Sequence, residues 1–263
     1  MAYDRGPSAG HFALSDTLAR VSITPTIWWH SADEPTLILG GAQQSSEIDL
    51  EACAAVGVHV VQRQAGGTAV YASPDVLGLD VALPPGHELI KPDVVESYRW
   101  LGDVWATTLR SLRVDAHVVG IEEARRAPPV AAEVLSALKM ACFGTLSPFE
   151  VTAEGRKIVG LAQVRRRGAE LLQNAIHLHF DAESLVQLLS IGDHRQVSDE
   201  LRRAAVGLND VTQSTGNVTH VIEAFEHTLA LQMGIRLVDG ILTEYELAHL
   251  NGQVGAGSAG GGP

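Results

Sequence analysis

The chain has 263 residues, which is enough to bury one large core or two small ones. Hydrophobic residues make up 46% and charged residues 19%, as in an ordinary globular protein, and no apolar run approaches the roughly 18 residues that span a bilayer. The formal net charge of −12 argues against a nucleic-acid partner, because phosphate contacts need a positive field. The amino terminus lacks the basic and then apolar pattern of a signal peptide, so we expect a cytoplasmic protein with no membrane partner.

The first two-thirds of the chain alternate between short strands and helices. The pattern predicts helices over residues 10–22, 47–56 and 92–112, and strands over residues 26–30, 36–39, 58–62, 69–71 and 77–83. Ser45 or Ser46 is expected to cap the second helix, and Gly57 to end it. The loop over residues 64–68 is expected to turn one strand back into the next.

Three further segments, over residues 149–153, 157–165 and 169–180, predict a strand meander. Helices are expected over residues 182–189, 198–206, 217–233 and 243–250, the last with Thr243 and Glu246 spaced as in a capping box. The glycine-rich segment 251–263 is predicted to be disordered, which leaves residues 1–250 as the folded domain.

The cysteines and histidines do not predict a metal site. The two cysteines, Cys53 and Cys142, are too few for a disulfide framework or a zinc site, so each is either a core residue or a reactive thiol. Cys53 lies in an apolar helical segment and is expected in the core. His177 and His179 share one face of a predicted strand, but no third ligand is evident from spacing, so we expect a solvated face and no metal.

Lys157 stands out because it is one of three lysines against sixteen arginines. An ammonium is a compact donor that can hold one carbonyl or phosphate oxygen at the bottom of a pocket, which a guanidinium does less well. The alternative is an ordinary lysine on a surface hairpin.

Two segments in this order carry a family resemblance: Gln62-Arg-Gln-Ala-Gly-Gly-Thr-Ala-Val-Tyr71 and, about ninety residues later, Gly155-Arg-Lys-Ile-Val-Gly-Leu-Ala-Gln-Val-Arg165. They resemble the lipoate-protein ligase and octanoyltransferase family, which shares a catalytic domain with biotin protein ligases. The resemblance extends over about residues 8–190. It implies an α+β fold with a mixed, largely antiparallel central sheet flanked by helices.

The resemblance also implies an apolar tunnel for an eight-carbon acyl chain. The implied acyl-binding residues lie in the glycine loop and in the later strand: Arg63, Gly66, Gly67, Thr68, Ala69, Tyr71, Gly160 and Ala162. Gly66 and Gly67 would let the backbone approach the ligand where a Cβ would collide. Lys157 would bind the acyl carbonyl oxygen and stabilise the oxyanion of the tetrahedral intermediate. The alternative for the loop is a hairpin turn that binds nothing.

Cys142 decides the expected reaction. Its position, fifteen residues before Lys157, resembles the cysteine placement in one group of transferases. We therefore expect transfer of an octanoyl or lipoyl group through an acyl-cysteine, with an acyl carrier protein or glycine-cleavage carrier protein as donor. The acceptor would be a lysine of a lipoyl domain or of the glycine-cleavage carrier protein. No cofactor is needed, since exchange between thioesters is nearly isoenergetic. An inert core cysteine is the alternative.

Other functions stay open. An ATP-dependent lipoate-protein ligase would act through lipoyl-AMP with ATP and Mg. The chain departs from the ligase pattern at Thr68, where ligases usually have a third glycine, and at residues 72–75, where they have His-Asp. A non-catalytic accessory protein that binds a lipoyl carrier is a second alternative. A biotin ligase would share the fold, but its basic-rich loop is unlike residues 64–68. Acidic carrier proteins would be repelled by the net negative charge of this chain. We therefore expect the three arginines at residues 165–167 to supply a local positive docking surface.

Overall fold

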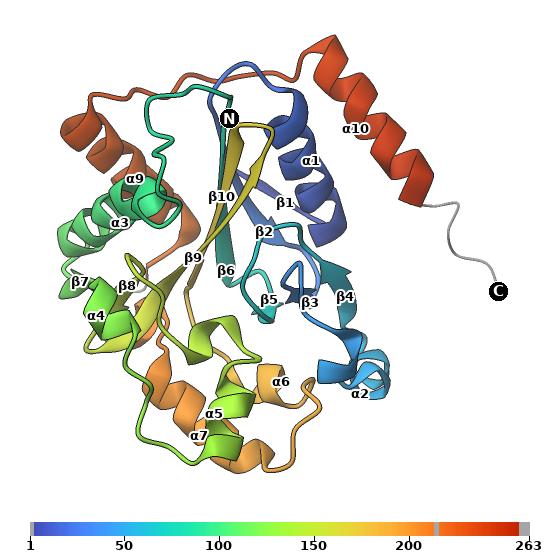
Figure 1. Cartoon of the computed structure of the whole chain (residues 1–263), viewed down its shortest axis with the longest axis vertical. Helices are drawn as coiled ribbons and strands as arrows, with labels where there is room; N and C mark the ends of the chain where they lie inside the picture. The colour runs from blue at the N-terminus through green and yellow to red at the C-terminus, as the bar shows by residue number, and fades with distance from the viewer. Residues whose placement is uncertain (1–2, 213–215, 258–263) are drawn as a thin grey trace.

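The computed structural model describes residues 3–212 and 216–257, and a seven-stranded mixed sheet forms its centre (Figure 1). The strand order is β1-β2-β6-β10-β9-β8-β7, and every neighbouring pair is antiparallel except β1 and β2. The strands are β1 (Asp4–Gly6), β2 (Thr26–Ala32), β6 (Val76–Leu83), β7 (Ala116–Val118), β8 (Val151–Ala153), β9 (Arg156–Arg166) and β10 (Ala169–His177). This arrangement confirms the predicted α+β fold with a largely antiparallel central sheet.

A second, three-stranded sheet carries the glycine loop. It contains β3 (Thr36–Leu39), β4 (His59–Gln62) and β5 (Val70–Ala72) in the order β4-β3-β5. The loop after β4 was expected to turn the chain back onto β4, but β3 lies between the two strands. The reason is the helix α2 (Leu50–Ala55), which crosses over between β3 and β4 and makes them parallel neighbours, so β5 pairs with the free edge of β3.

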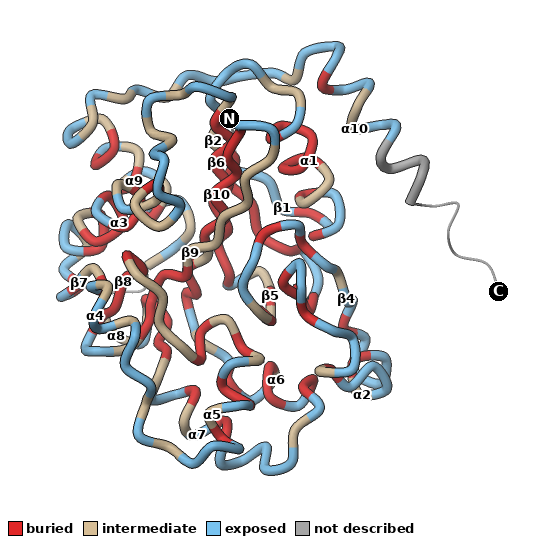
Figure 2. Tube along the Cα trace, in the orientation of Figure 1, coloured by how far each residue is buried: buried red, intermediate tan, exposed pale blue. Residues whose placement is uncertain are grey.

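The two faces of the large sheet carry different helices. Trp28 and Trp29 are neighbours in β2 and point to opposite faces, as the two-residue period of a strand requires. On the first face, α1 (Ser8–Val21) packs with the carboxy-terminal helix α10 (Glu244–Gly257). On the second, Trp29 contacts Trp105 of α3 (Arg99–Ser111) and Phe225 of α9 (Val218–Met233), with ring centroids 6.1 and 5.2 Å away. The central strands are buried between these helices, as Figure 2 shows.

Several shorter helices complete the fold around the edge of the molecule. They are α4 (Ile121–Ala124), α5 (Ala132–Leu138), α6 (Ala182–Val186), α7 (His194–Ala204) and α8 (Leu208–Val211). Three 3₁₀ turns accompany them: η1 (Ser45–Glu47), η2 (Glu96–Tyr98) and η3 (Cys142–Gly144). No helix in the described ranges combines the length and the apolar character needed to cross a membrane.

Two helices begin later than expected. α2 starts at Leu50 because the Asp49 side chain accepts a hydrogen bond from the backbone N–H of Ala52, so neither predicted serine is the cap. The long helix expected from residue 92 begins only at Arg99. The capping box of Thr243 and Glu246 is confirmed by hydrogen bonds in both directions.

The carboxy-terminal segment also differs from expectation. α10 extends to Gly257, so residues 251–257 are helical rather than disordered. The rest of the predicted tail, residues 258–263, lies outside the described residues.

Candidate active site

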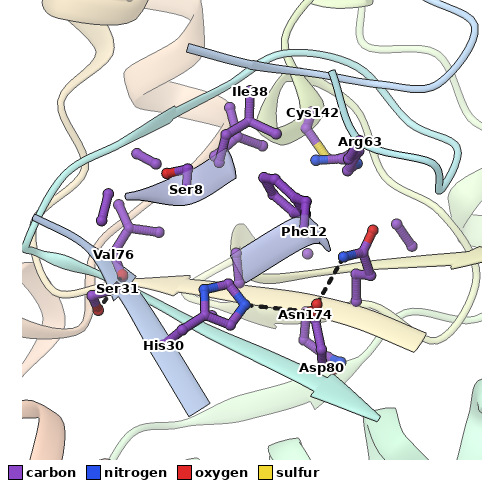
Figure 3. Close-up of a pocket in the computed structure, with 18 of the residues that line it drawn as sticks. Ser8, Phe12, His30, Ser31, Ile38, Arg63, Val76, Asp80, Cys142 and Asn174 are labelled. Carbon is purple, nitrogen blue, oxygen red and sulfur yellow. Dashed lines mark hydrogen bonds and ion pairs between the residues drawn. The ribbon is translucent and has the colours of Figure 1, made fainter. Parts of the chain in front are cut away.

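A pocket lies between the first face of the large sheet, helix α1 and the small sheet (Figure 3). Cys142 and Arg63 line one end of the pocket, and His30 and Asp80 line the other. The remaining lining residues are mostly small or apolar: Ser8, Phe12, Ser31, Ala32, Ile38, Val70, Ala72, Val76, Gly78, Phe143, Gly160, Leu161, Ala162, Gln173, Asn174 and Ala175. Such a lining suits an apolar ligand fixed by a few polar groups.

The cysteine turn and the glycine loop are joined by their backbones. The N–H of Cys142 donates to the carbonyl oxygen of Ala69 over 2.8 Å, and the N–H of Ala69 donates to the carbonyl oxygen of Met140 over 3.0 Å. These bonds make a short parallel bridge between two segments more than seventy residues apart. The predicted nucleophile and the predicted loop therefore lie together at one end of the pocket.

Arg63 is the positive side chain beside the sulfur. Its side chain is buried, with 7% exposed, and Nη2 lies 3.9 Å from Sγ of Cys142. The same guanidinium donates to the carbonyl oxygen of Gly66, from Nη2 over 2.9 Å and from Nε over 3.2 Å. Arg63 thus holds the loop in shape while it presents a positive charge to the cysteine.

The two loop glycines differ in what their backbones require. Gly67 has φ +89°, and a Cβ there would lie 2.6 Å from Arg63 Nη2 and 3.7 Å from Cys142 Sγ. A Cβ on Gly66 would meet no atom of the described residues within 4 Å, so the space beside Gly66 is open. Gly40, to which the sequence pattern assigned no role, must be a glycine, because a Cβ there would overlap the carbonyl oxygen of Gly67.

Lys157 is 1% exposed and its ammonium faces three protein oxygens. Nζ donates to the carbonyl oxygens of Cys142 over 2.7 Å and Thr145 over 3.3 Å, and it pairs with Glu150 Oε1 at 2.6 Å. An ammonium has three protons, so these acceptors use its full capacity. Lys157 therefore holds the backbone of the predicted nucleophile, although it does not itself line the pocket.

Glu150 is the buried partner of Lys157 and was not among the predicted site residues. Its carboxylate, 1% exposed, also accepts from the N–H of Ser147 over 2.7 Å and of Leu161 over 3.2 Å. Burial raises the pKa of Glu150, and the ammonium of Lys157 opposes that rise. The only signal in the sequence is a glutamate amid apolar neighbours, Phe149 and Val151, just before a strand.

Phe143 forms a wall between the pocket and a buried histidine. Lys157 Nζ lies 5.1 Å from the centroid of its ring, and His177 contacts the ring edge-on at 4.6 Å between centroids. Burial lowers the pKa of His177 to about 4, so this imidazole is neutral at pH 7. His179 is exposed, so the two histidines expected on one solvated face are separated.

The other predicted acyl-binding residues divide between two environments. Gly160 and Ala162 of β9 line the pocket. Tyr71 does not line it, because Val70 and Ala72 take the pocket face of β5 and Tyr71 packs in the core on the other side. Also absent from the lining are Gly66, Gly67, Thr68 and Ala69, the last of which bonds Cys142 through its backbone.

Comparison with known proteins agrees with this architecture. The profile of the lipoyl protein ligase A/B catalytic domain matches residues 8–230. The chain is 34% identical over 251 residues to octanoyltransferase LipM of Kyrpidia tusciae, covering 92% of this chain and 89% of that protein. It is 30% identical over 254 residues to octanoyltransferase LipM of Geobacillus kaustophilus, covering 93% and 89%.

Solved structures of similar fold are lipoate ligases. A putative lipoate protein ligase of Thermoplasma acidophilum with bound lipoic acid superposes with a TM-score of 0.75 at 19% identity, over 97% of this chain and 93% of that one. A lipoate-protein ligase A bound with ATP superposes with a TM-score of 0.73 at 21% identity, over 96% and 91%. The matched profile covers most of the chain, and so this protein belongs to the lipoyl protein ligase A/B catalytic domain family.

Proposed function

We propose that this protein transfers an octanoyl or lipoyl group from a carrier protein to a lysine of a lipoyl domain, through a thioester on Cys142. The observation that carries the proposal is the position of Cys142, half-buried at the end of a largely apolar pocket, with Arg63 Nη2 3.9 Å from its sulfur. The names of the octanoyltransferase relatives support the acyl group and the reaction class.

In the first step, the thiolate of Cys142 attacks the thioester carbonyl carbon of the loaded donor. A carbon–sulfur bond forms to Cys142, the bond to the carrier sulfur breaks, and the carrier leaves as a thiolate that takes up a proton. Arg63 supplies the positive charge that the attacking thiolate faces. Both thioesters have similar energy, so the step proceeds without ATP.

In the second step, the neutral amine of the acceptor lysine attacks the thioester on Cys142. An amide forms, the sulfur leaves as a thiolate, and the amine loses a proton to solvent or to the leaving sulfur. An amide is more stable than a thioester, so this step drives the transfer. The proposed acceptor is a lipoyl domain or a glycine-cleavage carrier protein. The proposed donor is an acyl carrier protein or a glycine-cleavage carrier protein.

Lys157 acts in this scheme by holding the turn that carries Cys142. Its bond to the Cys142 carbonyl oxygen fixes the backbone of the nucleophile, and Glu150 fixes the ammonium. Binding of the acyl carbonyl by Lys157 requires that Nζ first exchange one of its three acceptors. We therefore assign Lys157 as a positioning residue that also contributes positive charge at the site.

The pocket supplies the affinity for the acyl chain. Burying the six methylenes and the terminal methyl of an octanoyl group at about 0.8 kcal/mol each gives roughly 5 to 6 kcal/mol, which is enough to hold the chain with few polar contacts. The lining beyond Cys142 is consistent with this, since Gly160, Ala162 and Ala175 leave space above the sheet.

A relay assay tests the proposal against the ATP-dependent ligase. Purified protein is mixed with octanoyl-loaded carrier protein and apo lipoyl domain without ATP, and separately with free octanoate, apo lipoyl domain and MgATP. Octanoyl-lipoyl domain in the first mixture and none in the second is the expected result. Product only in the second mixture would establish the ligase, and binding without product in either mixture would establish the accessory protein.

A further inference from the structure

A row of small residues crosses the floor of the pocket. Gly160 of β9 lies opposite Ala175 of β10, and Ala175 lies opposite Gly78 of β6. All three line the pocket, and none carries more than a methyl group. Neighbouring strands are about 4.8 Å apart, so the row from Gly160 to Gly78 is about 10 Å long.

Aromatic rings close the two ends of this row. Phe143 covers Gly160, where a Cβ would lie 3.2 Å from Phe143 Cε2. His30, which lies opposite Gly78 on β2, covers that glycine so closely that a Cβ there would lie 2.4 Å from His30 Cε1. Phe143 follows Cys142 in the chain, so the imidazole marks the end of the row away from the nucleophile.

Neighbouring side chains hold the His30 ring in this position. Its Nε2 lies 3.6 Å from Asp80 Oδ1, and its ring is 4.7 Å from the ring of His11. Asp80 is fixed in turn by the amide of Gln173, which donates to Oδ2 over 2.8 Å. His30 is 9% exposed, and Nε2 is buried with no hydrogen-bond partner among the described residues (Figure 3).

We propose that His30 is the far wall of the acyl pocket and limits the length of the acyl chain that the pocket accepts. The proposal rests on the acyl transfer proposed above. The imidazole stands over Gly78, at the end of the row away from Phe143 and Cys142, so an acyl chain that runs from the sulfur along the row meets the ring. A longer chain must displace the imidazole, which is packed against His11 and Asp80, or leave methylenes outside the pocket.

The chain-length profile of the acyl-enzyme tests the wall. The protein is incubated with carrier protein loaded with hexanoyl, octanoyl, decanoyl or dodecanoyl groups, and the rate of adduct formation is measured by intact mass. We expect wild type to prefer octanoyl over dodecanoyl by about tenfold or more, the factor that corresponds to 1.4 kcal/mol. His30→Ala should raise the dodecanoyl rate relative to octanoyl by a similar factor.

Two further variants separate the wall from a loss of folding. His30→Phe keeps a ring at the end of the row and should keep the preference for octanoyl. Ala175→Val fills the middle of the row and should slow octanoyl more than hexanoyl, with the imidazole untouched.

The outcomes distinguish this inference from the proposed function. Wild type that forms a Cys142 adduct, together with a His30→Ala profile equal to that of wild type, would overturn the wall alone. An Ala175→Val variant with unaltered preference would overturn the path of the chain along the row. Wild type that forms no adduct with any chain would overturn the transferase and the wall together.

Discussion

The ammonium of Lys157 donates a hydrogen bond to the backbone carbonyl oxygen of Cys142, with 2.7 Å between Nζ and O. The lysine comes from strand β9 and the cysteine from turn η3, so the bond ties a sheet residue to the turn of the proposed nucleophile. Glu150 completes the arrangement from the other side of the ammonium at 2.6 Å. The rigid sheet thereby sets the position of the sulfur at the end of the pocket.

Removing Lys157 should lower stability through the loss of its ion pair with Glu150, and slow transfer through the loss of its bond to the Cys142 backbone. Lys157→Met leaves the Glu150 carboxylate buried without its counter-charge, which costs about 3–5 kcal/mol in the free energy of unfolding. It should also slow acyl transfer by about a hundredfold, because the cysteine turn loses its anchor. Urea unfolding and transfer rates measure the two effects.

The double variant Lys157→Met with Glu150→Gln is the control. Removal of both charges should recover much of the stability but none of the transfer rate. Recovery of the transfer rate in the double variant would contradict the positioning role of Lys157.

Arg63 should control the reactivity of Cys142. In a Cys53→Ala background, Arg63→Met should slow alkylation of Cys142 by iodoacetamide at pH 7 by about tenfold, the factor for an interaction with a charged group worth about 1.5 kcal/mol. Arg99→Met is the matched control, since Arg99 pairs with Glu96 on the surface. Equal alkylation rates in all three proteins would remove Arg63 from the mechanism.

The glycine loop offers a comparison between adjacent residues. Gly67→Ala should destabilise the protein by about 1–2 kcal/mol and slow transfer, because φ is +89° and the new methyl meets the Arg63 guanidinium. Gly66→Ala should leave the free energy of unfolding nearly unchanged, since no atom of the described residues lies within 4 Å of the new methyl group. Thermal unfolding of both variants measures the difference, and equal losses would contradict the geometry of the loop.

His177 should make stability fall in mild acid. Burial lowers its pKa in the folded protein to about 4, below the ordinary 6.5 of the unfolded chain. Between these values the unfolded state binds more protons, so its contribution is fully present above pH 6.5 and is lost as pH falls toward 4. The loss is about 3 kcal/mol. Urea unfolding of wild type and His177→Gln across this range should show a smaller loss in the variant, and parallel curves would contradict the assignment.

The arginine run should contribute to docking through two of its three members. Arg165 is held inside the fold by Glu170 and by the carbonyl oxygen of Lys91, so its loss would disturb structure. Arg166→Ser with Arg167→Ser leaves that network intact and should weaken transfer to an acidic carrier and flatten its dependence on salt. Rates equal to wild type at low salt would exclude this surface from docking.

The parts of the fold with local signals were predictable. The strand meander after Cys142 and the capping box at Thr243 follow from periodicity and from residues close in sequence. The pairing of β5 with β3 was not predictable from the glycine loop, because the crossover through α2 decides which edge remains free.

The proximity of side chains was predictable where the family pattern names a residue, and less so where three-dimensional register decides. The order of Arg63, Cys142 and Lys157 in the chain indicated a common site, and the structure brings them together. Tyr71 was expected to contact the acyl chain, although strand alternation with Val70 could have placed it on the opposite face. Glu150 has no sequence motif of its own, because its partner is fixed only by the fold.

The row from Gly160 to His30 depends on contacts far apart in the sequence. It requires the registers of β9, β10, β6 and β2 together. Gly160 and Ala175 face each other across a hairpin, but Gly78 and His30 come from strands much earlier in the chain. The sequence shows that these residues are small, but only the strand registers show that they lie side by side.

The most direct test of the account is the mass of the protein after incubation with octanoyl-loaded carrier protein in the absence of ATP. The account predicts one octanoyl group that hydroxylamine removes, that maps to Cys142, and that passes to an apo lipoyl domain. Cys53→Ala should behave as wild type, and Cys142→Ala should acquire no group. An unmodified wild-type protein, with a lipoyl domain acylated only when free acid and MgATP are supplied, would contradict transfer through Cys142.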